Sequence, residues 1–188
     1  DVFDDLIDET PLKLCRRLHG VAGIGAGQVG KYRRTDQVDA IGVVSPHAGY
    51  IYSGSVAGAV LSAIRPKKTY VIIGPNHTGL GEPAAIDPNS AWRTPLGDVK
   101  IDRELADKII EHCEYATYDK AAHEAEHSVE VQLPFLQVLQ PDFSIVPVVV
   151  SYADLDVYRS VGRSIVRSIA DLGMAGDVTV IASSDMTH

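Results

Sequence analysis

Continuous runs of apolar, mostly β-branched residues recur along the chain and are the feature that most constrains its fold. They occupy residues 41–45, 70–74, 144–150 and 178–182. A strand with one exposed face alternates apolar and polar residues, whereas a strand covered on both faces is apolar throughout. The four runs therefore predict strands of a buried, largely parallel sheet.

Two amphipathic segments predict helices that cover this sheet. Residues 102–112 place apolar side chains on one stripe behind Asp102, which is a favourable N-cap. Residues 155–172 repeat this spacing, with Asp154 before the segment and Gly173 after it. Aspartate before a helix and glycine after it are typical of helix ends.

Two further segments complete the expected order of elements. The small apolar residues 55–64 predict a helix lying close to the sheet, and another helix is expected to start near Ser128, interrupted by Pro134. Pro147, inside an apolar run, favours an edge strand or a bulge. Strands separated by helices predict an α/β fold with helices on both faces of the sheet.

Length and composition set further limits. The 188 residues are expected to form a single domain over 1–188, and a net charge of −8 argues against nucleic-acid binding. No apolar run approaches the roughly 20 residues of a membrane helix, and no signal peptide is evident. The two cysteines, Cys15 and Cys113, fit a reducing cytoplasm and predict small buried side chains. The chain begins without methionine, so its true start is expected to lie upstream.

A glycine-rich stretch near the amino terminus matches a nucleotide-binding pattern in spacing only. Gly25, Gly27 and Gly30 fit the dinucleotide fingerprint. That fingerprint requires a strand before it and a helix after it. Residues 12–19 read as an amphipathic helix, and residues 31–36 offer no apolar helical face, so a surface loop is the better interpretation.

Three of the apolar runs end in a loop that carries histidine. His47, His77 and His188 follow the first, second and last of the runs named here, and Asp185 precedes His188 by three residues. Ligands of open α/β sheets bind beyond the carboxyl ends of parallel strands, so these imidazoles are expected at one rim. An aspartate–histidine pair can hold an imidazole tautomer for acid–base work.

Other histidines have less distinctive surroundings. His123 lies in a polar stretch and is interpreted as a solvated side chain. His127 stands beside Glu126 and close to Glu130, which fits either a pocket residue or a helix terminus. Strand-end loops also hold Gly, Pro, Asn and Ser simply to turn the chain.

Five motifs occur together and in order, and jointly they resemble the Memo family. This family, of the AmmeMemoRadiSam system protein B type, is a relative of the class III extradiol (LigB-like) dioxygenases. The resemblance covers residues of about 40–188. The motifs are Pro46-His47-Ala48-Gly49-Tyr50-Ile51-Tyr52-Ser53-Gly54, Gly74-Pro75-Asn76-His77, Thr94-Pro95-Leu96-Gly97, Glu126-His127-Ser128-x-Glu130 and Ser183-Ser184-Asp185-Met186-Thr187-His188.

The resemblance implies a LigB-like three-layer sandwich with a non-haem metal pocket at the strand ends. Fe(II) is the implied metal, with Cu or Zn as alternatives. His47 matches the first ligand. Family members carry two consecutive histidines in the second motif and use the second, where this chain has His77 and Thr78. Either His77 takes over that ligand position or the site has lost a ligand.

The remaining roles are also implied by the resemblance. His188 matches the acid–base histidine, with Asp185 as its pocket neighbour. The third ligand, a cysteine in Memo-type proteins, would lie beyond residue 188, so the fold is expected to be incomplete at its carboxyl end. The pocket residues implied are Tyr50, Tyr52, Asn76, Glu126 and His127.

Three functions stay open at this point. The first is a metal-dependent, dioxygenase-like redox enzyme. The second is a non-catalytic metal- or peptide-binding protein using the same pocket. The third is a metal-dependent hydrolase with His47, His77 and Asp185 around a water. A small-molecule or peptide ligand is expected, without nucleic acid or membrane, and a radical S-adenosylmethionine protein is an implied partner.

Overall fold

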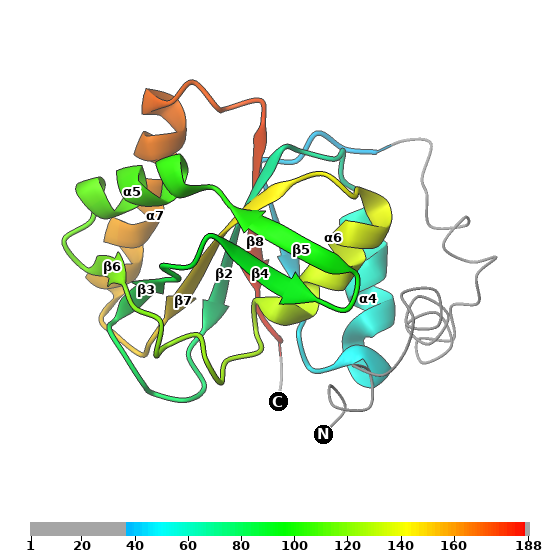
Figure 1. The fold of residues 1–188 in the computed structure, drawn as a ribbon, viewed down its shortest axis with the longest axis horizontal. Coiled ribbons are helices and arrows are strands. Elements are labelled where there is room, and N and C mark those ends of the chain that lie inside the picture. Colours follow the sequence, from blue (N-terminus) through cyan, green and yellow to red (C-terminus); the bar gives the residue numbers. More distant parts are fainter. Residues whose placement is uncertain (1–36, 187–188) are drawn as a thin grey trace.

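A mixed, mostly parallel sheet forms the centre of the molecule (Figure 1). The computed structural model describes residues 37–186, and within them the sheet has eight strands in the order β1-β8-β2-β7-β3-β6, with β5 pairing β7 and β4 pairing β5. Antiparallel pairing is confined to β3 with β7 and β4 with β5. The strands are β1 (Gly42–Ser45), β2 (Thr69–Pro75), β3 (Ala84–Ile86), β4 (Ala91–Thr94), β5 (Gly97–Ile101), β6 (Ala116–Tyr118), β7 (Ser144–Val150) and β8 (Val178–Ser183).

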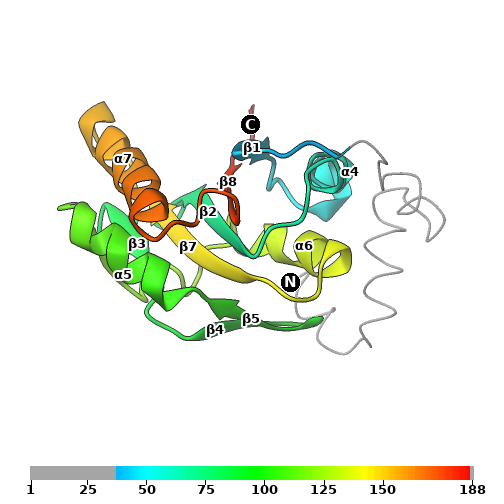
Figure 2. The same ribbon diagram turned by 90° about the horizontal axis from the view of Figure 1, so that it is seen from above.

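Helices lie on both faces of this sheet, so the predicted helix–sheet–helix arrangement is confirmed. Helices α5 and α7 lie together on one face, and α4 and α6 lie on the other (Figure 2). None of the helices in the described part of the chain is both long and apolar enough to cross a membrane. The helical elements are α4 (Tyr50–Ser62), α5 (Arg103–His112), the short 3-10 helix η1 (Glu130–Gln132), α6 (Leu133–Leu139) and α7 (Leu155–Asp171).

Strands β2 and β7 are apolar along most of their length because each face packs against its own layer of helices. Strand β1 lies at the edge of the sheet and is mostly exposed, so the prediction of a strand buried on both faces is wrong for residues 41–45. Successive residues of a strand point to opposite faces. Ile72 of β2 accordingly packs with Leu61 of α4 and Leu133 of α6. Its neighbour Val71 packs with Leu105 of α5 and Ile165 of α7 in the second cluster. These buried contacts explain why period-2 alternation is absent from the sequence.

The predicted helix ends agree with the structure in most respects. Asp102 caps α5 through Oδ1, which accepts a hydrogen bond from the Leu105 backbone at 3.1 Å. Asp154 is the N-cap residue of α7 but makes no side-chain capping bond. Gly173 follows α7 with φ +67°, in the left-handed region that favours glycine. Helix α4 begins at Tyr50, five residues before the predicted segment.

Pro147 lies inside the sheet, so the prediction of an edge strand or bulge is wrong. Strand β7 pairs with β2 along its whole length on one side. On the other side β5 pairs with Ser144 and Ile145, and β3 pairs with residues 148–150. The carbonyl of Ile145 points to the β5 side, because it accepts a hydrogen bond from the Asp102 backbone nitrogen. Backbone groups two residues apart point to the same side of a strand, so the nitrogen of Pro147 also points there, at a position between the segments paired with β5 and with β3. The missing N–H of proline therefore breaks no ladder bond.

Three elements were not predicted: β3, β6 and the β4–β5 hairpin. They are short, and the motif at residues 94–97 forms the tight turn of the hairpin, where Gly97 has φ +120°. Cys113 is buried, as predicted. The glycine-rich stretch, Cys15 and His188 lie outside the described residues.

Candidate metal centre

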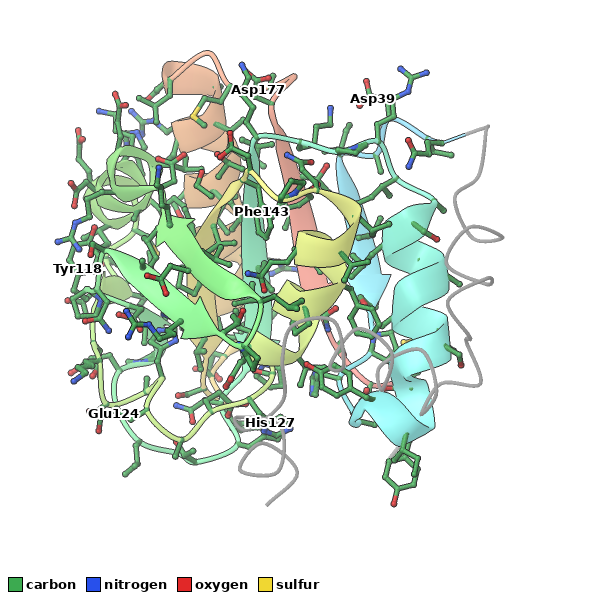
Figure 3. The ribbon with its side chains drawn as sticks, turned by 45° about the vertical axis from the view of Figure 1, so that its right-hand side comes forward. Asp39, Tyr118, Glu124, His127, Phe143 and Asp177 are labelled. Atoms are coloured by element: carbon green, nitrogen blue, oxygen red, sulfur yellow. The ribbon has the colours of Figure 1, made fainter. Side chains whose placement is uncertain are left out.

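The site lies where three adjacent parallel strands end. His47 follows β1, His77 follows β2 and Asp185 follows β8, which runs between them. The imidazole rings of His47 and His77 have centroids 5.3 Å apart. In Figure 3, His127 lies at this same end of the molecule, opposite Asp39 and Asp177. The expectation that separate segments deliver imidazoles to one rim is therefore confirmed for His47 and His77.

Asp185 supports the loop that carries His47. Its Oδ1 accepts a hydrogen bond from the His47 backbone nitrogen at 2.8 Å, and its Oδ2 lies 3.8 Å from His47 Nε2. The carboxylate thus contacts His47 through both its backbone and its ring. The pairing of Asp185 with His188 cannot be followed, because His188 lies outside the described residues.

Hydrogen bonds of Ser183 determine which nitrogen of His47 carries the proton. Ser183 donates its single hydrogen to the Ser128 carbonyl and accepts a hydrogen bond from Gln132 Nε2 at 2.8 Å. His47 Nδ1 lies 3.1 Å from the same hydroxyl and must donate to it. His47 Nε2 is therefore an unprotonated, buried acceptor, and it makes no hydrogen bond within residues 37–186.

Burial keeps the His47 ring neutral. Desolvation lowers the pKa of His47, because the charged form loses more hydration than the neutral form. The negative charge of Asp185 opposes this shift, and the neighbouring His77 and His127 reinforce it. The net effect is a lowered pKa. A neutral imidazole is the form that binds a metal ion.

Glu126 orders the second half of the site. Its carboxylate accepts hydrogen bonds from His77 Nδ1 at 2.9 Å and from the His77 backbone nitrogen at 2.6 Å. The backbone nitrogens of His127 and Ser128 donate to the same carboxylate at 2.9 and 2.8 Å. Burial acts to raise the pKa of Glu126, but these hydrogen bonds outweigh it and lower the pKa to about 2. The side chain is 1% exposed and is ionised at neutral pH.

An ionised Glu126 also sets the tautomer of His77. A carboxylate only accepts hydrogen bonds, so His77 Nδ1 carries a proton, and in the neutral ring the lone pair lies on Nε2. This carboxylate–histidine arrangement is the usual way in which proteins orient an imidazole for metal binding. The neutral form of His77 thus offers Nε2, the same nitrogen that His47 leaves without a proton.

His127 adds a third imidazole at the rim. Its ring stacks on His77 with centroids 4.9 Å apart and an interplanar angle of 22°. One potential ligand atom from each of His77, Glu126 and His127 lies within 4.8 Å of the others. Both Glu126 oxygens already accept hydrogen bonds, so we interpret Glu126 as the residue that orients His77.

A glycine allows the loop of residues 126–128 to lie against the end of β2. A Cβ built on Gly74 would lie 2.8 Å from the Ser128 Cβ and closer still to its hydroxyl. Ser128 Oγ donates to the Pro75 carbonyl at 3.0 Å, which joins the loop to the strand. Any larger residue at position 74 would push Glu126 away from His77.

The other predicted site residues take different positions. Asn76 Oδ1 accepts hydrogen bonds from the Thr78 hydroxyl at 2.8 Å and from the Gly79 backbone at 2.9 Å, so Asn76 and Thr78 shape the loop. Tyr50 is buried, with its ring 5.6 Å from that of Phe135. Tyr52 is 81% exposed on the first turn of α4.

Sequence reasoning missed the polar residues beneath His47. Ser45 donates to Gln132 at 2.7 Å, and Gln132 in turn donates to the Pro46 carbonyl and to Ser183. Ser183 belongs to the motif at residues 183–188, but no feature of that motif indicates a contact with His47. Gln132 carries no signal of its own, because its partners are distant along the chain.

Fold and site together define the class of protein: an α/β protein with a histidine–carboxylate centre at the carboxyl edge of a mostly parallel sheet. The family model described as Memo-like protein matches residues 15–188. The chain therefore belongs to the Memo family.

Proteins of archaea are similar to this chain over most of its length. The MEMO1 family protein of Pyrococcus abyssi is 47% identical over 152 residues, which is 77% of this chain and 52% of that protein. The counterpart from Desulfurococcus amylolyticus is 42% identical over 170 residues, or 88% of this chain and 59% of that protein. That from Methanopyrus kandleri is 48% identical over 151 residues, or 78% and 53%. The chain thus spans little more than half the length of these relatives.

Proposed function

We propose that this chain is a metal-binding Memo-family protein in which His47 and His77 are ligands of Fe(II). The observation that carries the proposal is the unprotonated, buried Nε2 of His47, which lacks a hydrogen-bond partner within residues 37–186. A buried acceptor without a partner costs about 1–3 kcal/mol, and a bound metal ion offsets this cost. His77 Nε2 offers a second lone pair nearby.

The donor set fits a borderline metal ion. Imidazole suits Fe, Cu and Zn, whereas Mg and Ca prefer oxygen ligands. Fe(II) held by such ligands with open coordination positions supplies redox chemistry toward oxygen. His127, which is half-exposed beside His77, is the further imidazole available at the rim.

The protein's own contribution is to hold both imidazoles in the binding tautomer. The Ser183 hydroxyl accepts a hydrogen bond from Nδ1–H of His47, and the Glu126 carboxylate accepts one from Nδ1–H of His77. The lowered pKa of His47 keeps its ring neutral, so metal ions need not compete with protons there near neutral pH. This preorganisation favours metal binding in the folded state.

Anaerobic Fe(II) titration calorimetry tests the proposal. We expect saturable binding by the full chain, and a loss of about tenfold or more in affinity for His47→Ala and for His77→Ala. His112→Ala is the matched control, because His112 pairs with Asp171 between α5 and α7. Absence of binding by the folded parent chain would refute the proposal, as would equal affinity of all three variants.

A further inference from the structure

A polar cavity lies beside the proposed metal centre. It has a volume of about 250 Å³ and is lined by β4 residues, by Asp87 and by the segment that runs from Lys120 to Glu130. Glu126 borders both this cavity and the loop of His77. Glu124, on the rim of the cavity, lies at the same end of the molecule as His127 (Figure 3). None of the imidazoles of the proposed metal centre lines it.

His123 gives the cavity a buried acceptor, and the prediction that this histidine is solvated is wrong. The residue is 8% exposed, because the segment that carries it folds against β3. His123 Nε2 lies 3.2 Å from the Ala85 carbonyl oxygen, which only accepts, so Nε2 carries the proton. Nδ1 is then an acceptor, and it has no hydrogen-bond partner among the described residues. Burial lowers the pKa of His123, which keeps the ring neutral.

The remaining inner wall combines negative charge with an aromatic ring. The carboxyl groups of Glu126 and Asp87 are both buried here, with 5% and 3% of each residue exposed. Asp87 accepts hydrogen bonds from Trp92 Nε1 at 2.8 Å and from the Asn89 backbone at 2.7 Å. The Trp92 ring thereby stands edge-to-face with His123, with centroids 5.7 Å apart. Aromatic faces attract cations, and tryptophan does so most strongly.

The cationic residues of the cavity lie at its rim and are paired with neighbouring acids. Arg93 is bound to Asp98 at 3.1 Å, and Lys120 is bound to Glu124 at 3.3 Å. Their side chains are 87% and 60% exposed. They therefore do not neutralise the buried acceptors. Anions are disfavoured by the inner wall, where Glu126 and Asp87 are already present.

We propose that this cavity binds a small organic ammonium ion, with its N–H groups donating to His123 Nδ1 and to the Glu130 carboxylate and its charge beside the Trp92 ring. A primary ammonium has three donors and matches a wall made of acceptors. A bare metal ion fits less well. Among the described residues only His77, Glu126 and His127 bring three potential ligand atoms close together. The volume of about 250 Å³ is sufficient for a small organic ion.

The single tryptophan of the chain, Trp92, reports on occupancy of the cavity. Its fluorescence is followed while the full chain, kept metal-free with EDTA, is titrated with butylammonium chloride near neutral pH. Butan-1-ol and sodium butanoate serve as the neutral and anionic counterparts, and sodium chloride controls for ionic strength. We expect a saturable change with butylammonium alone. Because metal is absent, the result does not depend on the proposed Fe(II) site.

Three variants locate the binding. His123→Phe keeps the ring and removes the acceptor, and Glu130→Gln keeps the shape and removes the charge. We expect a loss of about tenfold in affinity for His123→Phe and about fivefold for Glu130→Gln. The control Glu104→Gln, at an exposed position of α5 that does not line the cavity, should stay within about twofold. Circular dichroism establishes that each variant is folded. If His123→Phe does not fold, Glu130→Gln decides alone.

Two results would overturn the proposal. One is the absence of a saturable response to butylammonium in the parent chain, or an equal response to butan-1-ol or butanoate. The other is unchanged affinity in the folded His123→Phe and Glu130→Gln variants, since binding would then lie elsewhere on the molecule.

Discussion

Replacing Glu126 with glutamine tests whether one buried carboxylate holds the histidine loop together. The four hydrogen bonds to Glu126 all come from N–H donors, two of His77 and one each of His127 and Ser128. The amide of glutamine has one oxygen and one NH2 group. Whichever way it is turned, the NH2 group faces a backbone N–H donor, that of His77 on one side or those of His127 and Ser128 on the other. Glu126→Gln therefore loses both the charge and part of the hydrogen bonding.

The structure sets the size of the effect through the pKa of Glu126, which falls from 4.5 to about 2 in the folded protein. By proton linkage this difference corresponds to about 3 kcal/mol of folding free energy at pH 7. Because the pKa is lower in the folded state, the stabilisation is complete above about pH 5 and is lost as the pH falls towards 2. At pH 3 about 1 kcal/mol of it remains.

The assay is urea unfolding of the EDTA-treated parent and variant from pH 7 down to pH 3, followed by circular dichroism. We expect the free energy of unfolding to differ by about 3 kcal/mol at pH 7 and by about 1 kcal/mol at pH 3. Glu124→Gln is the matched control, because Glu124 is 63% exposed and its ion pair is with Lys120, four residues earlier in the same turn segment. It should change stability by less than about 0.5 kcal/mol. A difference for Glu126→Gln that is as small as in the control, or that does not vary with pH, would refute the reasoning.

Three further substitutions test other contacts by the same unfolding assay. Gly74→Ala should destabilise by about 1–3 kcal/mol, because its Cβ would overlap Ser128, whereas Gly162→Ala, at a helical position with open space, should not destabilise. Ser183→Ala should cost about 1–3 kcal/mol, since it leaves buried polar partners unsatisfied, and equal stability to the parent would contradict the hydrogen-bond assignment. Asp102→Ala should cost about 1–3 kcal/mol, because it removes both the α5 cap and the acceptor of the buried Thr69 hydroxyl, and an effect below about 0.3 kcal/mol would show that both contacts are unimportant.

Local sequence patterns were sufficient for the long elements. The apolar runs that form β2, β7 and β8 indicate strands covered on two faces, and this can be predicted from the residues of each run alone. Helices α5 and α7 follow from their apolar stripes and their flanking Asp and Gly residues. The short strands β3 and β6 have three residues each, too few to show a periodic pattern. They are strands because β3 pairs with β7 on one side and with β6 on the other.

Proline and histidine show where local patterns mislead. Pro147 looks like an edge residue from the sequence, because a central strand needs its backbone donors. Only the arrangement of β5 and β3 along β7 creates a position where no donor is needed. His123 looks solvated because its sequence neighbours are polar, yet its segment folds against β3 and Trp92.

The sequence by itself determined which loops carry the histidines, since His47 and His77 follow directly on apolar runs that form strands, and parallel strands end at one edge. The tertiary structure decided how those histidines are protonated. Ser183 lies 136 residues from His47 along the chain, and Glu126 lies 49 residues from His77. Hydrogen-bond direction depends on atoms brought within about 3 Å of each other, and spacing along the chain carries no information about such pairs.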